Sequence, residues 1–112
     1  MTAMEIRFYE DFVDSIWNEE KTQTLRYGWS KLPEKGDSYH AISTQKGDAF
    51  AEIEIQAVEE LTVEESVQRD FSGHRNYTSV EELLEELEEY YDGISEETTL
   101  HLIEFELTEK RR

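Results

Sequence analysis

The ten residues AFAEIEIQAV, at positions 49–58, alternate apolar side chains with glutamate or glutamine. This period of two is that of a half-buried β-strand, and it determines which side chains share a face. The residues expected on the apolar face are Ala49, Ala51, Ile53, Ile55 and Ala57, and those on the other face are Glu52, Glu54 and Gln56. The core is therefore expected to be built against a sheet.

Three further segments are expected in that sheet. Residues 37–44, DSYHAIST, read as a shorter strand, and the turn QKGD at 45–48 joins it to the first strand as a hairpin, with Gly47 available for a positive φ. Residues 98–107, TTLHLIEFEL, are apolar on both faces, which indicates a central or barrel position. Residues 4–9 alternate like a half-buried strand at the start of the chain.

Three segments carry helical signals. Apolar residues recur at three- and four-residue spacing in YEDFVDSIWNEE, residues 9–20. Capping-box patterns, Thr62 with Glu65 and Ser79 with Glu82, predict a short helix to about Arg69 and a longer one over 80–91. The continuous apolar stripe of the longer helix is interpreted as core. Together these elements predict an α+β fold: a small β-barrel of about five strands with two or three flanking helices, in a single domain over residues 1–112.

The composition narrows the functional classes. Cysteine is absent, which excludes disulfides, thiolate metal sites and a cysteine nucleophile, and the three histidines lie far apart in the sequence, so we predict no metal and no cofactor. No secretory signal or membrane span is evident, which favours a cytoplasmic monomer. The chain has 28 acidic and 11 basic residues, a net charge of −17. One explanation is a halophilic host, where salt screens the repulsion between surface carboxylates.

The segment KTQTLR, residues 21–26, begins the one stretch that departs from this acidic bias. Residues 21–46 hold five basic and two acidic residues. An enzymatic interpretation makes Thr24 a nucleophile and Lys21 its base, provided that burial or Arg26 lowers the lysine pKa. In a binding interpretation Lys21 and Arg26 contact phosphate, while Tyr27 and Trp29 stack on unpaired bases. The third interpretation is an ordinary polar strand edge.

The segment EEKTQTLR, residues 19–26, resembles the G-x-K-x-x-T-x-R signature of the ASCH domain, a small barrel of the PUA-like superfamily, with Glu19 where the glycine is usual. Weaker likenesses follow in the same order along almost the whole chain. They are FYEDFVDSI at 8–16, KGD at 35–37, AEIEI at 51–55, LT at 61–62, the segment 70–91 and LIEF at 102–105. The resemblance implies a role linked to RNA, because PUA-like barrels hold RNA or a modified base in a cleft.

The same resemblance also implies a candidate reaction. Some short bacterial ASCH proteins are amidohydrolases that deacetylate N4-acetylcytidine, with the motif's threonine as nucleophile, its lysine as base and a later glutamate as proton donor. Lys21 and Thr24 match the first two positions, but the expected glutamate falls within residues 73–75, GHR, which contain no carboxylate. His74 could donate the proton instead, or the site binds without catalysis and His74 and Arg75 contact the ligand, or His74 merely packs a loop.

Two carboxylates close in sequence, Glu65 and Asp70, could replace the missing acid, although no pattern places them in the cleft. We therefore favour a protein that binds RNA or a modified nucleoside through Lys21, Thr24, Arg26, Tyr27 and Trp29, together with His74 and Arg75. Hydrolysis of N4-acetylcytidine, or a related reaction, is the alternative.

Overall fold

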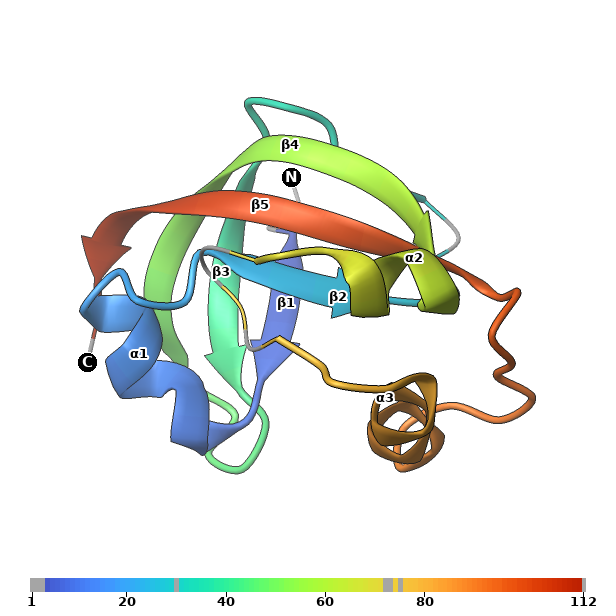
Figure 1. The fold of residues 1–112 in the computed structure, drawn as a ribbon. Coiled ribbons are helices and arrows are strands. Elements are labelled where there is room, and N and C mark those ends of the chain that lie inside the picture. The colour runs from blue at the N-terminus through green and yellow to red at the C-terminus, as the bar shows by residue number, and fades with distance from the viewer. Residues whose placement is uncertain (1–3, 30, 72–73, 75, 112) are drawn as a thin grey trace.

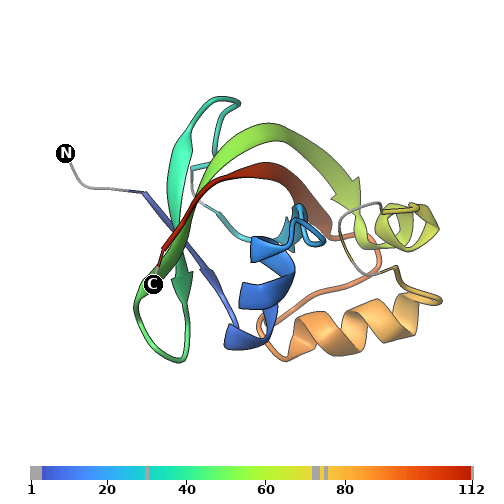
Figure 2. The ribbon, with the colours of Figure 1, turned by 90° about the vertical axis from the view of Figure 1, so that its left-hand side faces the viewer.

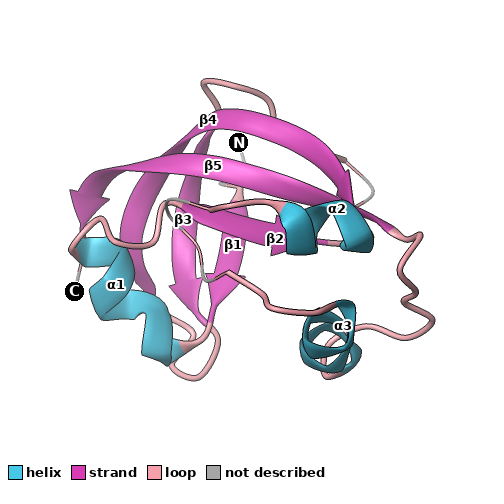
Figure 3. Cartoon of the chain, viewed as in Figure 1, coloured by secondary structure: helices cyan, strands magenta, loops and turns pink. Residues whose placement is uncertain are grey.

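The computed structural model describes residues 4–29, 31–71, 74 and 76–111, and its centre is a five-stranded mixed sheet (Figures 1 and 3). The strands are β1 (Glu5–Phe8), β2 (Gln23–Arg26), β3 (Ser38–Ser43), β4 (Ala49–Thr62) and β5 (Thr99–Lys110). Their order across the sheet is β1-β3-β4-β5-β2. The predicted hairpin is confirmed as the antiparallel pair β3–β4, and the two-sided apolar segment is confirmed as a central strand, β5.

The helices are η1 (Glu10–Phe12), α1 (Val13–Trp17), α2 (Val63–Gln68) and α3 (Val80–Glu88). The capping box of α2 is confirmed, because Thr62 accepts from the backbone N–H of Glu65 while the Glu65 side chain accepts from that of Thr62. Ser79 caps α3 in the same way through the N–H of Glu82. Both α1 and α3 lie below the arch of β4 and β5, as two perpendicular views show (Figures 1 and 2). None of these helices is long and apolar enough to cross a membrane.

The sheet differs from the predicted barrel. In the described part of the chain β1 pairs only with β3 and β2 only with β5, so the backbone pairing leaves β1 and β2 as two edges. The β1–β3 pair is parallel, a pairing that alternation within each strand could not reveal. The α+β class, the five strands and the flanking helices are confirmed, whereas closure into a barrel is not.

A β-bulge changes the face of the second half of β4. Ile55 pairs with Phe105 and Ala57 with Glu104, so Gln56 is the extra residue. The bulge reverses the alternation, leaving Ala57 exposed and packing Val58 against the core. The expectation that Ala57 shares the apolar face with Ile55 is therefore wrong.

The core consists of two clusters on the sheet. One contains Phe8, Ile53, Ile55, Ile103 and Phe105, with Val13 and Ile16 from α1 packed against them. The other joins β2, β4 and β5 to the helices and contains Leu25, Leu61, Leu100 and Leu102 with Leu83 and Leu87 of α3. The stripe of α3 is thus confirmed as core. This packing holds α3 close to β2, although about sixty residues separate them in the sequence.

Candidate functional site

A cleft of about 580 Å³ lies where β1, β2, the end of α1 and α3 approach one another. Its volume is within the range of about 300 to 1,000 Å³ typical of small-molecule sites. The lining side chains include Arg7, Phe8, Tyr9, Phe12, Glu20, Lys21, Thr24, Leu25, Arg26, His74, Tyr77, Glu86, Leu87, Tyr90 and Tyr91. Thr24 and Leu25 are neighbours on one strand and point to opposite faces, so the cleft wraps around the edge of β2.

The turn after α1 brings Lys21 into the cleft. The backbone N–H groups of Glu20 and Lys21 both donate to the carbonyl oxygen of Ser15, at 2.9 and 3.0 Å. Lys21 therefore lies outside β2, and the alternation that would direct it away from Thr24 does not apply. The sequence left open whether the chain still turns at this point, and the structure shows that it does.

Glu19 explains why a glycine is usual at this position of the ASCH signature. Its φ of 60° is in the left-handed region, where a residue with a Cβ is strained by roughly 1 kcal/mol. We expect Glu19→Gly to raise the free energy of unfolding by about 0.5 kcal/mol, because glycine relieves the strain but has a more flexible unfolded chain. Urea denaturation measures this, with Glu20→Gly as a destabilising control at the adjacent exposed position. A loss of stability in Glu19→Gly would contradict the prediction.

Lys21 has a lowered pKa. Burial, followed by the positive charge of Arg26, lowers the pKa of Lys21 from 10.5 to about 8, and Glu86 opposes this shift. The Nζ atom donates to the carbonyl oxygen of Gln23 at 3.0 Å and lies 4.8 Å from the ring centre of Phe12. A substantial neutral fraction of this amine is thus present at mildly alkaline pH, which is the state that a general base requires.

Arg26 fixes the hydroxyl group of Thr24 and connects the two sheet edges. Its Nε donates to Thr24 Oγ1 at 3.0 Å, and its Nη2 donates to the carbonyl oxygen of Arg7 on β1 at 2.6 Å. The guanidinium also lies 5.0 Å from the ring centre of Phe8. Since Thr24 Oγ1 accepts from Arg26, its own proton is left to be donated in another direction. Only 5% of Thr24 is exposed, so its hydroxyl lies deep in the cleft.

A carboxylate enters the cleft from α3. Glu86 is half-buried and accepts a hydrogen bond from the hydroxyl group of Tyr77. His74 lies on the same side, with ring centroids 5.9 Å from Tyr77 and 5.4 Å from Phe71. Lys21, Thr24 and His74 thus line one cleft, as the catalytic interpretation required, and Glu86 joins them.

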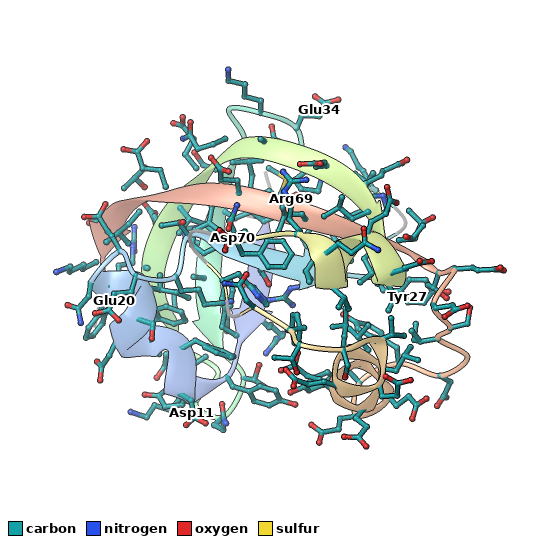
Figure 4. The ribbon with its side chains drawn as sticks, viewed as in Figure 1. Asp11, Glu20, Tyr27, Glu34, Arg69 and Asp70 are labelled. Carbon is teal, nitrogen blue, oxygen red and sulfur yellow. The ribbon has the colours of Figure 1, made fainter. Side chains whose placement is uncertain are left out.

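The other residues predicted for the site lie elsewhere. Tyr27 packs edge-on against Tyr91 in the second core cluster, and Figure 4 shows it on the opposite side of the view from Glu20. Trp29 stacks on Tyr39 at the first core cluster, with ring centroids 6.4 Å apart. Neither is among the described residues that line the cleft, and Arg75 lies outside the described residues.

Neither of the two substitute acids lines the cleft. Glu65 is engaged in the cap of α2, and Asp70, labelled in Figure 4, accepts from the side chain of Asn76 at 3.3 Å. Sequence reasoning missed Glu86, although a signal exists: it lies three residues after Leu83 and four before Tyr90, on the helix face that carries the apolar stripe. A single glutamate on a core-facing stripe indicates a buried carboxylate with a task.

The cleft differs chemically from the rest of the surface. Three cationic side chains, Arg7, Lys21 and Arg26, line it in a chain of net charge −17, and several aromatic rings surround them. This combination suits a flat polar ligand, with rings for its faces and charged donors for its oxygen atoms. The site also contains a hydroxyl group, an amine of lowered pKa and a carboxylate, the groups needed for acyl transfer.

Comparisons with known proteins identify the fold. The sequence matches no protein-family model and no curated protein. Among solved structures, protein EF3133 of the DUF984 family from Enterococcus faecalis matches with a TM-score of 0.74 and 18% identity, over 99% of this chain and 84% of that one. The ASCH domain from Lactobacillus crispatus matches with a TM-score of 0.67 and 16% identity, over 96% and 81% of the two chains. The ASCH protein from Zymomonas mobilis gives 0.65 and 15%, over 96% and 71%. The chain therefore has the fold of the ASCH domain proteins.

Proposed function

We propose that the cleft binds one nucleoside or unpaired base and hydrolyses an acyl amide on its exocyclic nitrogen, with N4-acetylcytidine as the model substrate. The observation that supports this most strongly is that Lys21, Thr24 and Glu86 line the same cleft. Hydrolysis ranked second on sequence grounds because no carboxylate was found near residue 74. Glu86 removes that objection, since it provides a carboxylate from α3.

The proposed reaction begins at Thr24. The neutral amine of Lys21 takes the hydroxyl proton as Thr24 Oγ1 attacks the acyl carbonyl carbon. The tetrahedral intermediate then collapses, the C–N bond breaks, and the leaving nitrogen receives that proton from the Lys21 ammonium through the Glu86 carboxylate. Water hydrolyses the Thr24 ester, which releases acetate and restores the hydroxyl group.

Arg26 acts as a positioning residue in this scheme. Its hydrogen bond to Thr24 Oγ1 orients the hydroxyl group, and its charge helps to lower the pKa of Lys21. Both effects act through the reacting groups, because the guanidinium itself is anchored on Arg7 and Phe8.

Replacing Glu86 with glutamine tests the proposed function. Glutamine keeps an acceptor for Tyr77 but cannot relay a proton, so we expect turnover of N4-acetylcytidine to fall by about 10²-fold, a typical size for loss of acid–base catalysis. Cytidine release is followed by chromatography at low and at molar KCl. Glu85→Gln is the matched control, because Glu85 is exposed on the same helix and does not line the cleft. Equal losses in the two variants, or no turnover by the unmodified protein, would refute the role.

A second function, binding without hydrolysis, is favoured by one observation. The Nζ atom of Lys21 donates to the carbonyl oxygen of Gln23, and Thr24 Oγ1 is engaged by Arg26, so both groups also serve as fixed polar contacts. Under this function the unmodified protein retains an unpaired base, Arg26→Met weakens that retention, and no cytidine is produced from N4-acetylcytidine.

A further inference from the structure

Exposed aromatic side chains are concentrated at the mouth of the cleft. In the described part of the chain four large apolar residues are exposed, and three of them line the cleft: Tyr9, Phe12 and Tyr90, at 37%, 39% and 48% exposure. The fourth is Met4. On a surface otherwise rich in carboxylates, such a concentration marks a place where a ligand covers the rings.

Two of these rings face each other across the mouth. Tyr9 follows β1 and Tyr90 follows α3, and their ring centroids are 5.5 Å apart with the planes tilted by 40°. The pair belongs to neither core cluster, and each ring comes from a different element. Rotation of either side chain can therefore widen the gap without moving a strand or a helix.

The exchange of contacts favours an aromatic ligand over the closed pair. Parting the rings gives up one tilted ring–ring contact. A planar base placed between them gains two stacking contacts, one on each face, and every base has two such faces. A ligand without a planar ring would open the pair and gain nothing in return.

We propose that Tyr9 and Tyr90 form an aromatic gate, which opens to hold one planar nucleobase between its two rings. The gate rests on the proposed function in one respect, namely that the base held there presents its exocyclic group to the Lys21–Thr24 end of the cleft. It also selects unpaired bases, because both faces of a base within a duplex are already covered by its stacked neighbours.

Binding of cytidine tests the gate independently of hydrolysis, since cytidine is the product and is not turned over. We expect Tyr9→Leu and Tyr90→Leu each to weaken cytidine binding about tenfold in isothermal titration calorimetry, while Tyr9→Phe and Tyr90→Phe remain within about twofold of the unmodified protein. Both positions are exposed, so these variants are expected to fold. Tyr27→Leu is the control, because Tyr27 does not line the cleft and should leave the affinity unchanged.

The outcomes separate the gate from the proposed hydrolysis. If the unmodified protein binds cytidine with this ring dependence but does not release it from N4-acetylcytidine, the gate stands and the hydrolase proposal fails. If turnover occurs while the leucine variants bind cytidine as tightly as the unmodified protein, the gate is wrong. The gate is also wrong if the unmodified protein does not bind cytidine, or if Tyr27→Leu causes the larger loss.

Discussion

Replacing Thr24 with valine should reduce the turnover of N4-acetylcytidine by about 10³-fold or more, because the variant lacks the attacking oxygen. Valine has nearly the shape of threonine, and Thr24 is only 5% exposed, so the backbone of β2 should be retained. Circular dichroism checks the fold, and single-turnover chromatography of the nucleoside measures the loss.

Two companion variants make this result specific. Thr22→Val alters the same motif at a threonine that does not line the cleft, so its turnover should remain within about threefold of the unmodified protein. Thr24→Ser restores a hydroxyl group and should recover part of the activity. Undiminished turnover in Thr24→Val would eliminate the nucleophile and leave Thr24 as a binding contact.

Replacing Lys21 with methionine should lower turnover by about 10² to 10⁴-fold, because the base is lost while much of the side-chain volume remains. In the unmodified protein, kcat/KM for N4-acetylcytidine should rise as the pH increases through about 8, since only the neutral amine accepts the proton. A pH profile from 6 to 10 measures both effects. A flat profile around pH 8 would contradict a role for Lys21 as base.

The same titration changes the stability of the protein. The pKa of Lys21 is about 8 when folded and 10.5 in the unfolded chain, so between these values the unfolded state binds more protons. Stability from this group therefore rises with pH across that window, by at most about 3 kcal/mol, and is lowest below pH 8, where the buried amine is charged. The difference in unfolding free energy between Lys21→Met and the unmodified protein should shrink from pH 7 to pH 10. Lys35→Met, at an exposed lysine, should show no such trend.

Local patterns predicted most of the fold because the signals were local. Alternation identified β4 and β5, Gly47 marked the turn of the hairpin, and the hydroxyl caps marked the starts of α2 and α3. Ala57 could not be placed, because a bulge depends on pairing with another strand. The parallel pairing of β1 with β3 joins segments that are more than thirty residues apart, and no pattern within either segment specifies it.

The site was predictable only where it lies within one segment. Lys21, Thr24 and Arg26 belong to a single motif, and all three line the cleft. Glu86 and Tyr90 reach the cleft because α3 packs beside β2, which depends on the tertiary arrangement of the second core cluster. Tyr27 and Trp29 were proposed as stacking residues because they adjoin the motif, yet their rings pack against Tyr91 and Tyr39.

The position of the cleft at the interrupted edge of the sheet separates rigidity from recognition. In the described residues β1 and β2 are joined by the Arg26 side chain, whose Nη2 reaches the carbonyl oxygen of Arg7. Widening the gap breaks that one side-chain contact and none of the backbone pairs that hold the five strands together. The width of the ligand that the fold accepts can therefore change through one replaceable side chain, while the architecture that supports it stays constant.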